Sequence, residues 1–170
     1  MKRLFYLLAA AAFTACGSAT TLSVMTFNMR YDNPEDGADN WRFRRGRVAE
    51  VIASHGVDVF GTQELLANQL GDLKRLLPGY AAVGVGREDG AEAGEFSAVF
   101  YRRDRFTPLE SGTFWLSETP DVAGSKGWDG ACERVATWVV LHDREGGREF
   151  LFVNTHLDHV GQVARSEEHT

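Results

Sequence analysis

The stretch VDVFGTQELLANQLGDLKRLLPG, residues 57–79, decides the fold. Its first part, VDVFGTQE, is a short apolar run that ends in polar residues, as in a buried strand that runs into a loop. Leucines then recur at helical spacing, at Leu66, Leu70, Leu73 and Leu77. Because Pro78-Gly79 is typical of a helix end, the stretch predicts a strand followed directly by a helix.

The residues before this stretch repeat the same order. TLSVMTFNM (21–29) alternates apolar and polar residues and is rich in β formers, which predicts a strand. NPEDGADN (33–40) consists of turn residues, and WRFRRGRVAEVIASHG (41–56) has helical periodicity up to a terminal glycine. The strand–helix–strand–helix order predicts βαβ units in the first half of the chain.

The second half has a different character. Four segments have the composition of strands: 80–86, 96–103, 134–143 and 148–156. DREGG joins the last two as a hairpin turn, and residues 116–131 form a long loop without periodicity. Long irregular loops in compact domains tend to line sites. We therefore expect an α/β protein with two packed β-sheets flanked by helices.

Chain length and net charge limit the number of domains and the classes of ligand. The chain has 170 residues, 44% of them hydrophobic, which suits one globular domain. Its net charge of -6 makes it a poor non-specific binder of nucleic acid, because such binding depends on Lys and Arg. The one basic cluster, Arg42, Arg44, Arg45 and Arg47, is interpreted as a solvated helix face.

The N-terminus predicts export. MKR is basic, LFYLLAAAAF is apolar but too short to span a membrane, and TACGSA is small and polar, so residues 1–20 read as a signal peptide. FTAC also resembles a bacterial lipobox, with Phe13 in place of the usual Leu, and Cys16 would then carry the lipid. The alternative is ordinary cleavage near Ala19. We expect a periplasmic or cell-envelope lipoprotein, or else a secreted protein, that meets a membrane only through such an anchor.

The remaining cysteine and the C-terminus carry no function in this interpretation. Cys132 is expected to be a buried thiol, and no disulfide forms once Cys16 is lipidated or removed. The last six residues, RSEEHT (165–170), match a translated sequencing-adapter string, AGA-TCG-GAA-GAG-CAC-ACG. We expect a domain over residues 21–164 and a non-native tail after it.

Three motifs place polar side chains at strand ends. Asn28 in TFN could hold a water or a phosphate oxygen, although asparagine is also common where a strand meets a turn. Glu64 in GTQE is a good ligand for a hard cation, or else caps the following helix. In NTHLDH, His156 and Asp158 share a face if the strand continues, and His159 follows.

One interpretation of NTHLDH is a zinc hydrolase of the metallo-β-lactamase type, whose motif is H-x-H-x-D-H. Asn154 then stands where that motif has a zinc-binding histidine, and an amide is a far poorer zinc ligand. That fold also leaves TFN and GTQE without a role.

A different family accounts for all three motifs together. MTFNMRYDN, DVFGTQE, GEFSAVFYRRDRF, SGTFWLSETP and FVNTHLDHVG, in this order, resemble the endonuclease/exonuclease/phosphatase superfamily and its secreted bacterial members. The resemblance runs from about Leu22 to Ala164. It implies a four-layer α/β sandwich that hydrolyses phosphoesters with Mg²⁺ or Mn²⁺.

The resemblance also implies roles for single residues. Glu64 matches the metal-binding glutamate, and Asn28 matches an asparagine near the metal and the phosphate. His156 matches a histidine at the scissile phosphate, which we expect to be cationic and hydrogen-bonded by Glu95. Arg134 falls near a phosphate-contacting arginine of some nucleases. Asp158 is assigned to substrate binding in the same pocket.

The substrate class stays open between nucleic acid, a nucleotide, a phospholipid head group and an inositol phosphate. The acidic balance favours small substrates over polymers. A non-catalytic relative that binds ligands through the same pocket is a further alternative.

We predict that the chain of residues 1–170 is itself inactive. The family's Asp-x-Asn motif and terminal Asp-His motif, which the resemblance makes responsible for activating water, do not occur in this sequence. We also expect unpaired strand edges and exposed apolar sheet faces. The check is an assay of purified 1–170 for Mg²⁺-dependent phosphodiesterase activity, and measurable turnover would refute the prediction.

Overall fold

A computed structural model describes residues 20–168. The expected signal peptide, Cys16 and the last two residues lie outside this range, so the export and lipidation hypotheses stay predictions. Within it, no helix is long and apolar enough to cross a membrane.

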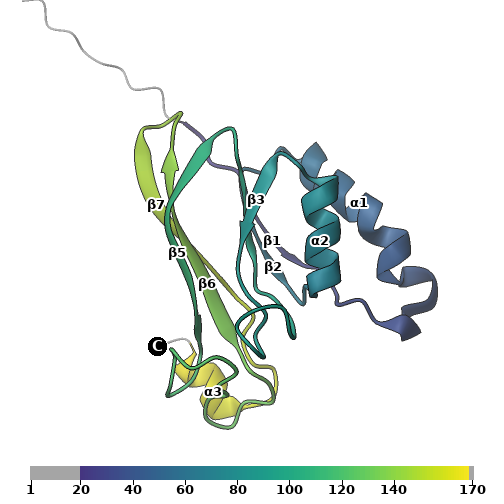
Figure 1. Ribbon diagram of the computed structural model, residues 1–170, viewed down its shortest axis with the longest axis vertical. Coiled ribbons are helices and arrows are strands. Elements are labelled where there is room, and N and C mark those ends of the chain that lie inside the picture. Colours follow the sequence, from purple (N-terminus) through teal and green to yellow (C-terminus); the bar gives the residue numbers. More distant parts are fainter. Residues whose placement is uncertain (1–19, 169–170) are drawn as a thin grey trace, which may run out of the picture.

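The fold is two packed sheets with helices on the first of them (Figure 1). The first sheet has the order β1-β2-β4-β3, and the second has the order β5-β6-β7. The strands are β1 (Val24–Asn28), β2 (Val59–Gln63), β3 (Tyr80–Val83), β4 (Val99–Arg102), β5 (Phe106–Trp115), β6 (Val135–Asp143) and β7 (Arg148–Thr155). The helices are η1 (Pro34–Asp39), α1 (Trp41–Ser54), α2 (Ala67–Leu76) and α3 (Gln162–Glu167).

The predicted βαβ start is confirmed. β1 and β2 are parallel and in register, Val24 opposite Val59 and Asn28 opposite Gln63. Their parallel course brings the carboxyl ends of both strands to the same edge of the sheet. Every other strand pair in the two sheets is antiparallel.

Two cores follow from the alternation along β2. Phe60 faces the helices and stacks on Phe100 of β4, with 4.7 Å between ring centroids. Val59 faces the second sheet, where it packs with Val139 and Leu141 of β6. A central strand buried on both faces accounts for the continuous apolar run in the sequence.

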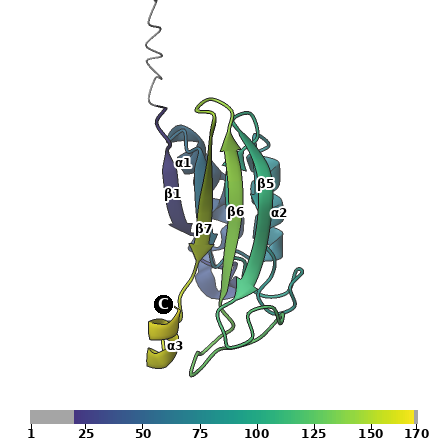
Figure 2. The same cartoon turned by 90° about the vertical axis from the view of Figure 1, so that its left-hand side faces the viewer.

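Three of the four expected layers lie within residues 20–168. No described helix covers the outward face of the second sheet, which Figure 2 shows toward the viewer. The expected exposure of an apolar sheet face is confirmed there by Leu109, Phe114, Leu151 and Val153, each 37–59% exposed. α3 lies beyond the end of this sheet, and residues 165–167, assigned by sequence to a non-native tail, form its last turn.

An amide locks the two sheets together. The side chain of Asn154 on β7 donates to the carbonyls of Thr62 (2.8 Å) and Ala98 (3.1 Å) and accepts from Gln63 (2.8 Å). The amide reaches these partners because Gly61 has no side chain, and a Cβ there would lie 2.4 Å from Asn154 Oδ1.

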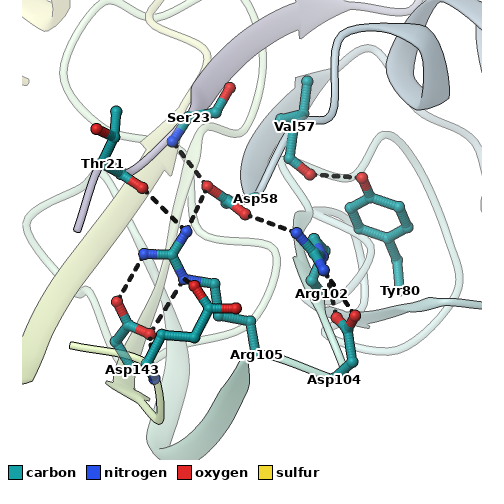
Figure 3. Close-up of polar contacts among 10 residues, drawn as sticks. Thr21, Ser23, Val57, Asp58, Tyr80, Arg102, Asp104, Arg105 and Asp143 are labelled. Atoms are coloured by element: carbon teal, nitrogen blue, oxygen red, sulfur yellow. Dashed lines mark hydrogen bonds and ion pairs between the residues drawn. The ribbon is translucent and has the colours of Figure 1, made fainter. Parts of the chain in front are cut away.

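A buried ion-pair network ties the opposite end of the sandwich (Figure 3). Arg105, between β4 and β5, donates to both oxygens of Asp143 at the end of β6 (3.1 and 2.8 Å) and to Asp58 before β2 (2.8 Å). The same guanidinium donates to the carbonyl of Thr21. The hydrogen bonds from Arg105 lower the pKa of Asp143 to about 2.

Replacing Gly61 by alanine is predicted to loosen the lock. Because Asn154 is fixed by three hydrogen bonds and cannot move aside, the extra methyl group should lower the free energy of unfolding by about 1–3 kcal/mol. The matched control is Gly46→Ala in α1, where nothing lies within 4 Å and alanine should stabilise by about 0.5–1 kcal/mol. Urea unfolding measures both, and equal effects of the two variants would contradict the account.

The Arg105 network is predicted to make the fold acid-sensitive. The folded-state pKa of Asp143 lies below its unfolded value, so its contribution is complete above about pH 4 and is lost as the pH falls toward 2. A shift of this size corresponds to about 2–3 kcal/mol. Asp143→Asn should flatten the dependence of unfolding free energy on pH over this window. An unchanged slope in that variant would rule out the assignment.

Candidate active site

A cavity of about 300 Å³ lies beside the carboxyl ends of β1, β2 and β7. Its lining combines cations, carboxylates, histidines and a thiol: Arg30, Tyr31, Glu64, Arg87, Glu95, Cys132, Arg134, His156 and His159. Four of the sequence-predicted site residues, Glu64, Glu95, Arg134 and His156, therefore share one cavity. Asn28 borders it through its contact with Glu64.

Glu64 is held with its carboxylate toward Asn28. Asn28 Nδ2 donates to Glu64 Oε1 (2.9 Å), and the Tyr31 backbone N–H lies 3.4 Å from Oε2. Glu64 follows β2 with a φ of +57°, in the left-handed region that a residue with a side chain rarely adopts. Glu64 does not cap the following helix, because α2 begins only at Ala67 and its N-cap is Leu66.

Arg30 repeats the same strained conformation after β1, with a φ of +53°. Gln69 of α2, a buried side chain that no sequence motif marks, holds both turns. Gln69 Nε2 donates to the Arg30 carbonyl (3.0 Å), and Gln69 Oε1 accepts from Asp32 N (3.2 Å) and Leu66 N (3.0 Å). Non-glycine residues in this region cost about 1–3 kcal/mol each and cluster at functional sites.

Glu95 pairs with an arginine rather than with the histidine. Arg87 Nη1 donates to Glu95 Oε2 (2.8 Å), whereas His156 Nδ1 lies 4.0 Å from the same oxygen, beyond hydrogen-bond distance. Burial raises the pKa of Glu95, and Arg87 opposes this rise. Burial, with a smaller effect from Arg134, lowers the pKa of His156. The hydrogen bond expected between Glu95 and His156 is therefore absent from this structure, and burial works against the cationic form of the ring.

Asp158 lies behind the cavity and not in its lining. β7 ends at Thr155, so the strand alternation that would place Asp158 beside His156 does not reach it. Its buried carboxylate accepts from the backbone of Ala131, Val160 and Gly161 at 2.7–2.9 Å, and these bonds lower its pKa. The assignment of Asp158 to substrate binding is corrected: it anchors the long loop 116–131.

Arg134 contacts Asp158 and is itself part of the cavity lining. It is 4% exposed, its Nε lies 3.5 Å from Asp158 Oδ2, and its Nη2 lies 3.0 Å from His159 Nδ1. Arg134 immediately precedes β6 and lines the cavity, where a phosphate contact was expected from the sequence.

Two further expectations are corrected. Cys132 is half-buried and lines the cavity, so it is not a core thiol. Arg44 is not part of a solvated face, because its guanidinium donates to the carbonyls of Met29 and Arg30 and so braces the turn after β1. Hydrophobic periodicity in the sequence does not indicate the position of Cys132 or of Arg44.

The position of Asn154 argues against a zinc hydrolase of the metallo-β-lactamase type. Both atoms of its amide group are hydrogen-bonded to the first sheet, and the residue is 7% exposed. Among the described residues no group of three or more His, Cys, Asp and Glu side chains could hold a metal ion. The donor set instead suits a hard cation that takes one carboxylate and completes its shell with water and substrate oxygens.

Comparison with known proteins agrees with this geometry. The model of the endonuclease/exonuclease/phosphatase family matches residues 25–168. A solved structure of an endonuclease/exonuclease/phosphatase from Bacteroides vulgatus is 49% identical with a TM-score of 0.87, over 88% of this chain and 57% of that chain. A mannosyl-6-phosphatase from Bacteroides thetaiotaomicron is 48% identical with a TM-score of 0.85, over 87% of this chain and 56% of that chain.

A more distant relative is a fungal nuclease. The 3'-5'-exoribonuclease subunit of the CCR4-Not complex from Aspergillus clavatus is 25% identical over 173 residues, which cover 85% of this chain and 26% of that protein. The chain thus spans a little over half the length of its solved relatives and about a quarter of the fungal one.

Proposed function

The chain belongs to the endonuclease/exonuclease/phosphatase family, and from that premise we propose that the whole protein is a phosphoester hydrolase that uses Mg²⁺ or Mn²⁺. One observation carries the metal dependence. Of the two carboxylates in the cavity lining, Glu95 is paired with Arg87, whereas Glu64 has no ion pair among the described residues. A partly enclosed, unpaired carboxylate is a site where a cation would bind favourably.

The residues around Glu64 fit that cation. Glu64 would hold it, with Asn28 fixing the orientation of the carboxylate. A divalent cation supplies charge neutralisation at the phosphate oxygens and at the leaving oxygen. His156, on the opposite sheet, lines the same cavity, where its ring N–H would donate a hydrogen bond to a phosphate oxygen.

Two properties support a small substrate. The cavity of about 300 Å³ has room for a phosphoryl group and part of its ester, and the net charge of -6 disfavours long polyanions. The relative named as a mannosyl-6-phosphatase, at 48% identity, supports a small phosphoester more strongly than the exoribonuclease at 25% does. We propose a low-molecular-weight phosphoester as the substrate.

Glu64→Gln is predicted to weaken Mg²⁺ binding and, with it, hydrolysis. The substitution keeps the size of the side chain and removes its charge, so Mg²⁺ binding should weaken by at least about 100-fold and hydrolysis should fall with it. Titration calorimetry with Mg²⁺ and a phosphate-release assay on the whole protein measure the two effects. Glu50→Gln, an exposed carboxylate on α1, is the matched control and should change neither.

The same experiment separates the alternatives. Mg²⁺ binding that survives Glu64→Gln but is lost in His156→Ala would contradict the proposal in favour of a histidine-centred metal site. Mg²⁺ binding that depends on Glu64, without turnover of any phosphoester by the whole protein, would identify a non-catalytic relative.

A further inference from the structure

Unsatisfied polar atoms gather at one place in the molecule. Among residues 20–168, three buried side-chain nitrogens lack a hydrogen-bond partner: Arg87 Nε, Arg134 Nε and His156 Nδ1. All three residues line the cavity that holds Glu64. A buried polar nitrogen without a hydrogen-bond partner is costly, and two of these three are guanidinium nitrogens, which can only donate. Their position around one cavity points to a ligand rich in acceptor oxygens.

Arg87 is the member of this group that no motif predicted. It lies in the loop between β3 and β4, and its side chain is 14% exposed. A guanidinium has five N–H donors, and the one hydrogen bond that Arg87 makes through them goes from Nη1 to Glu95. The other N–H groups of the guanidinium fork are available to donate to a ligand.

The backbone around Arg87 is fixed, so the fork has a defined position. Arg87 N donates to the Glu95 carbonyl (3.1 Å), and the Arg87 carbonyl accepts from the indole of Trp115 at the end of β5 (2.6 Å). The long loop packs against the next residue, since a Cβ on Gly124 would lie 2.4 Å from the Glu88 carbonyl oxygen. Arg87 is therefore pre-organised by both sheets.

Arg87 and Arg134 are arranged alike. Each has a carboxylate on one side, Glu95 at 2.8 Å and Asp158 at 3.5 Å, and each borders the cavity. Arg87 lies in a loop of the first sheet, and Arg134 immediately precedes β6 of the second sheet. An anion between them would contact both sheets.

We propose that Arg87 is a phosphate-binding residue that makes the site selective for phosphomonoesters, with Glu95 as its positioning residue. This inference rests on the proposed phosphoester hydrolase function. A monoester has three non-bridging oxygens and a charge near -2, whereas a diester has two such oxygens and a charge of -1. The cation at Glu64, with Arg134 and His156, already supplies partners for the two non-bridging oxygens of a diester. The third oxygen of a monoester needs a further donor, and the unpaired Nε of Arg87 lies in the same cavity lining.

The test compares two probes in the whole protein with Mg²⁺ present. Methylphosphonate is not hydrolysed and has three free oxygens, and dimethyl phosphate has two. Arg87→Gln should weaken methylphosphonate binding about 10- to 100-fold and change dimethyl phosphate binding by less than about threefold, as measured by titration calorimetry. Arg87→Lys should fall between, because lysine restores the charge without the fork.

Two further variants separate recognition from folding. Arg47→Gln on the outer side of α1 removes the same charge far from the cavity and should leave both affinities unchanged. Glu95→Gln should weaken methylphosphonate binding less than Arg87→Gln does, without a matching loss for dimethyl phosphate. Equal weakening of both probes by Arg87→Gln, or no weakening of either, would overturn the proposal.

Turnover is measured separately, so that the two proposals can fail independently. If the wild-type protein hydrolyses phosphodiesters faster than phosphomonoesters, the hydrolase function stands and the role of Arg87 is rejected. If it hydrolyses neither, yet Arg87 still selects methylphosphonate, the recognition stands and the hydrolase function is rejected.

Discussion

The amide of Asn154 is the interaction on which the geometry of the site depends. It joins β7 of the second sheet to the carbonyls of Thr62 and Ala98 in the first, across the gap that Gly61 leaves open. His156 lies two residues beyond this lock on one sheet, and Glu64 lies two residues beyond Thr62 on the other. Because the lock fixes the distance between the sheets, it also fixes how far apart Glu64 and His156 lie in the cavity lining.

The rest of the fold maintains this arrangement at some energetic cost. The Arg105 network clamps the far end of the sandwich, so the sheets are tied at both ends (Figure 3). Arg30 and Glu64 both hold strained left-handed backbone conformations at the cavity, and Gln69 and Arg44 bind the turn that follows β1. The cores on either side of β2 supply the stability that allows such strain.

Hydrophobic periodicity predicted those helices and strands whose apolar residues recur at regular spacing. Helices α1 and α2 and the strands other than β5 follow from apolar spacing, whereas the short helix α3 had no such signal. The structure also places Asn28 at the end of β1, and Glu64 and His156 directly after β2 and β7, as the sequence predicted. β5 escaped because Pro108 and a bulge interrupt its alternation, and residues 108–111 are all exposed. Arg87 could not be found in this way because a loop delivers it, and its partners Glu95 and Trp115 become neighbours only through the packing of two sheets. Asp158 was misplaced because the strand ends three residues earlier than the alternation assumed.

Glu64, which is hydrogen-bonded by Asn28 and shares a cavity with His156, is the residue that we propose binds the cation of this family member. A crystal of the whole protein soaked in Mn²⁺ tests this directly through the anomalous scattering of the metal. We expect an anomalous peak at the Glu64 carboxylate, inside the cavity that Arg134 and His156 also line. A peak among His156, Asp158 and His159, with none at Glu64, would contradict it.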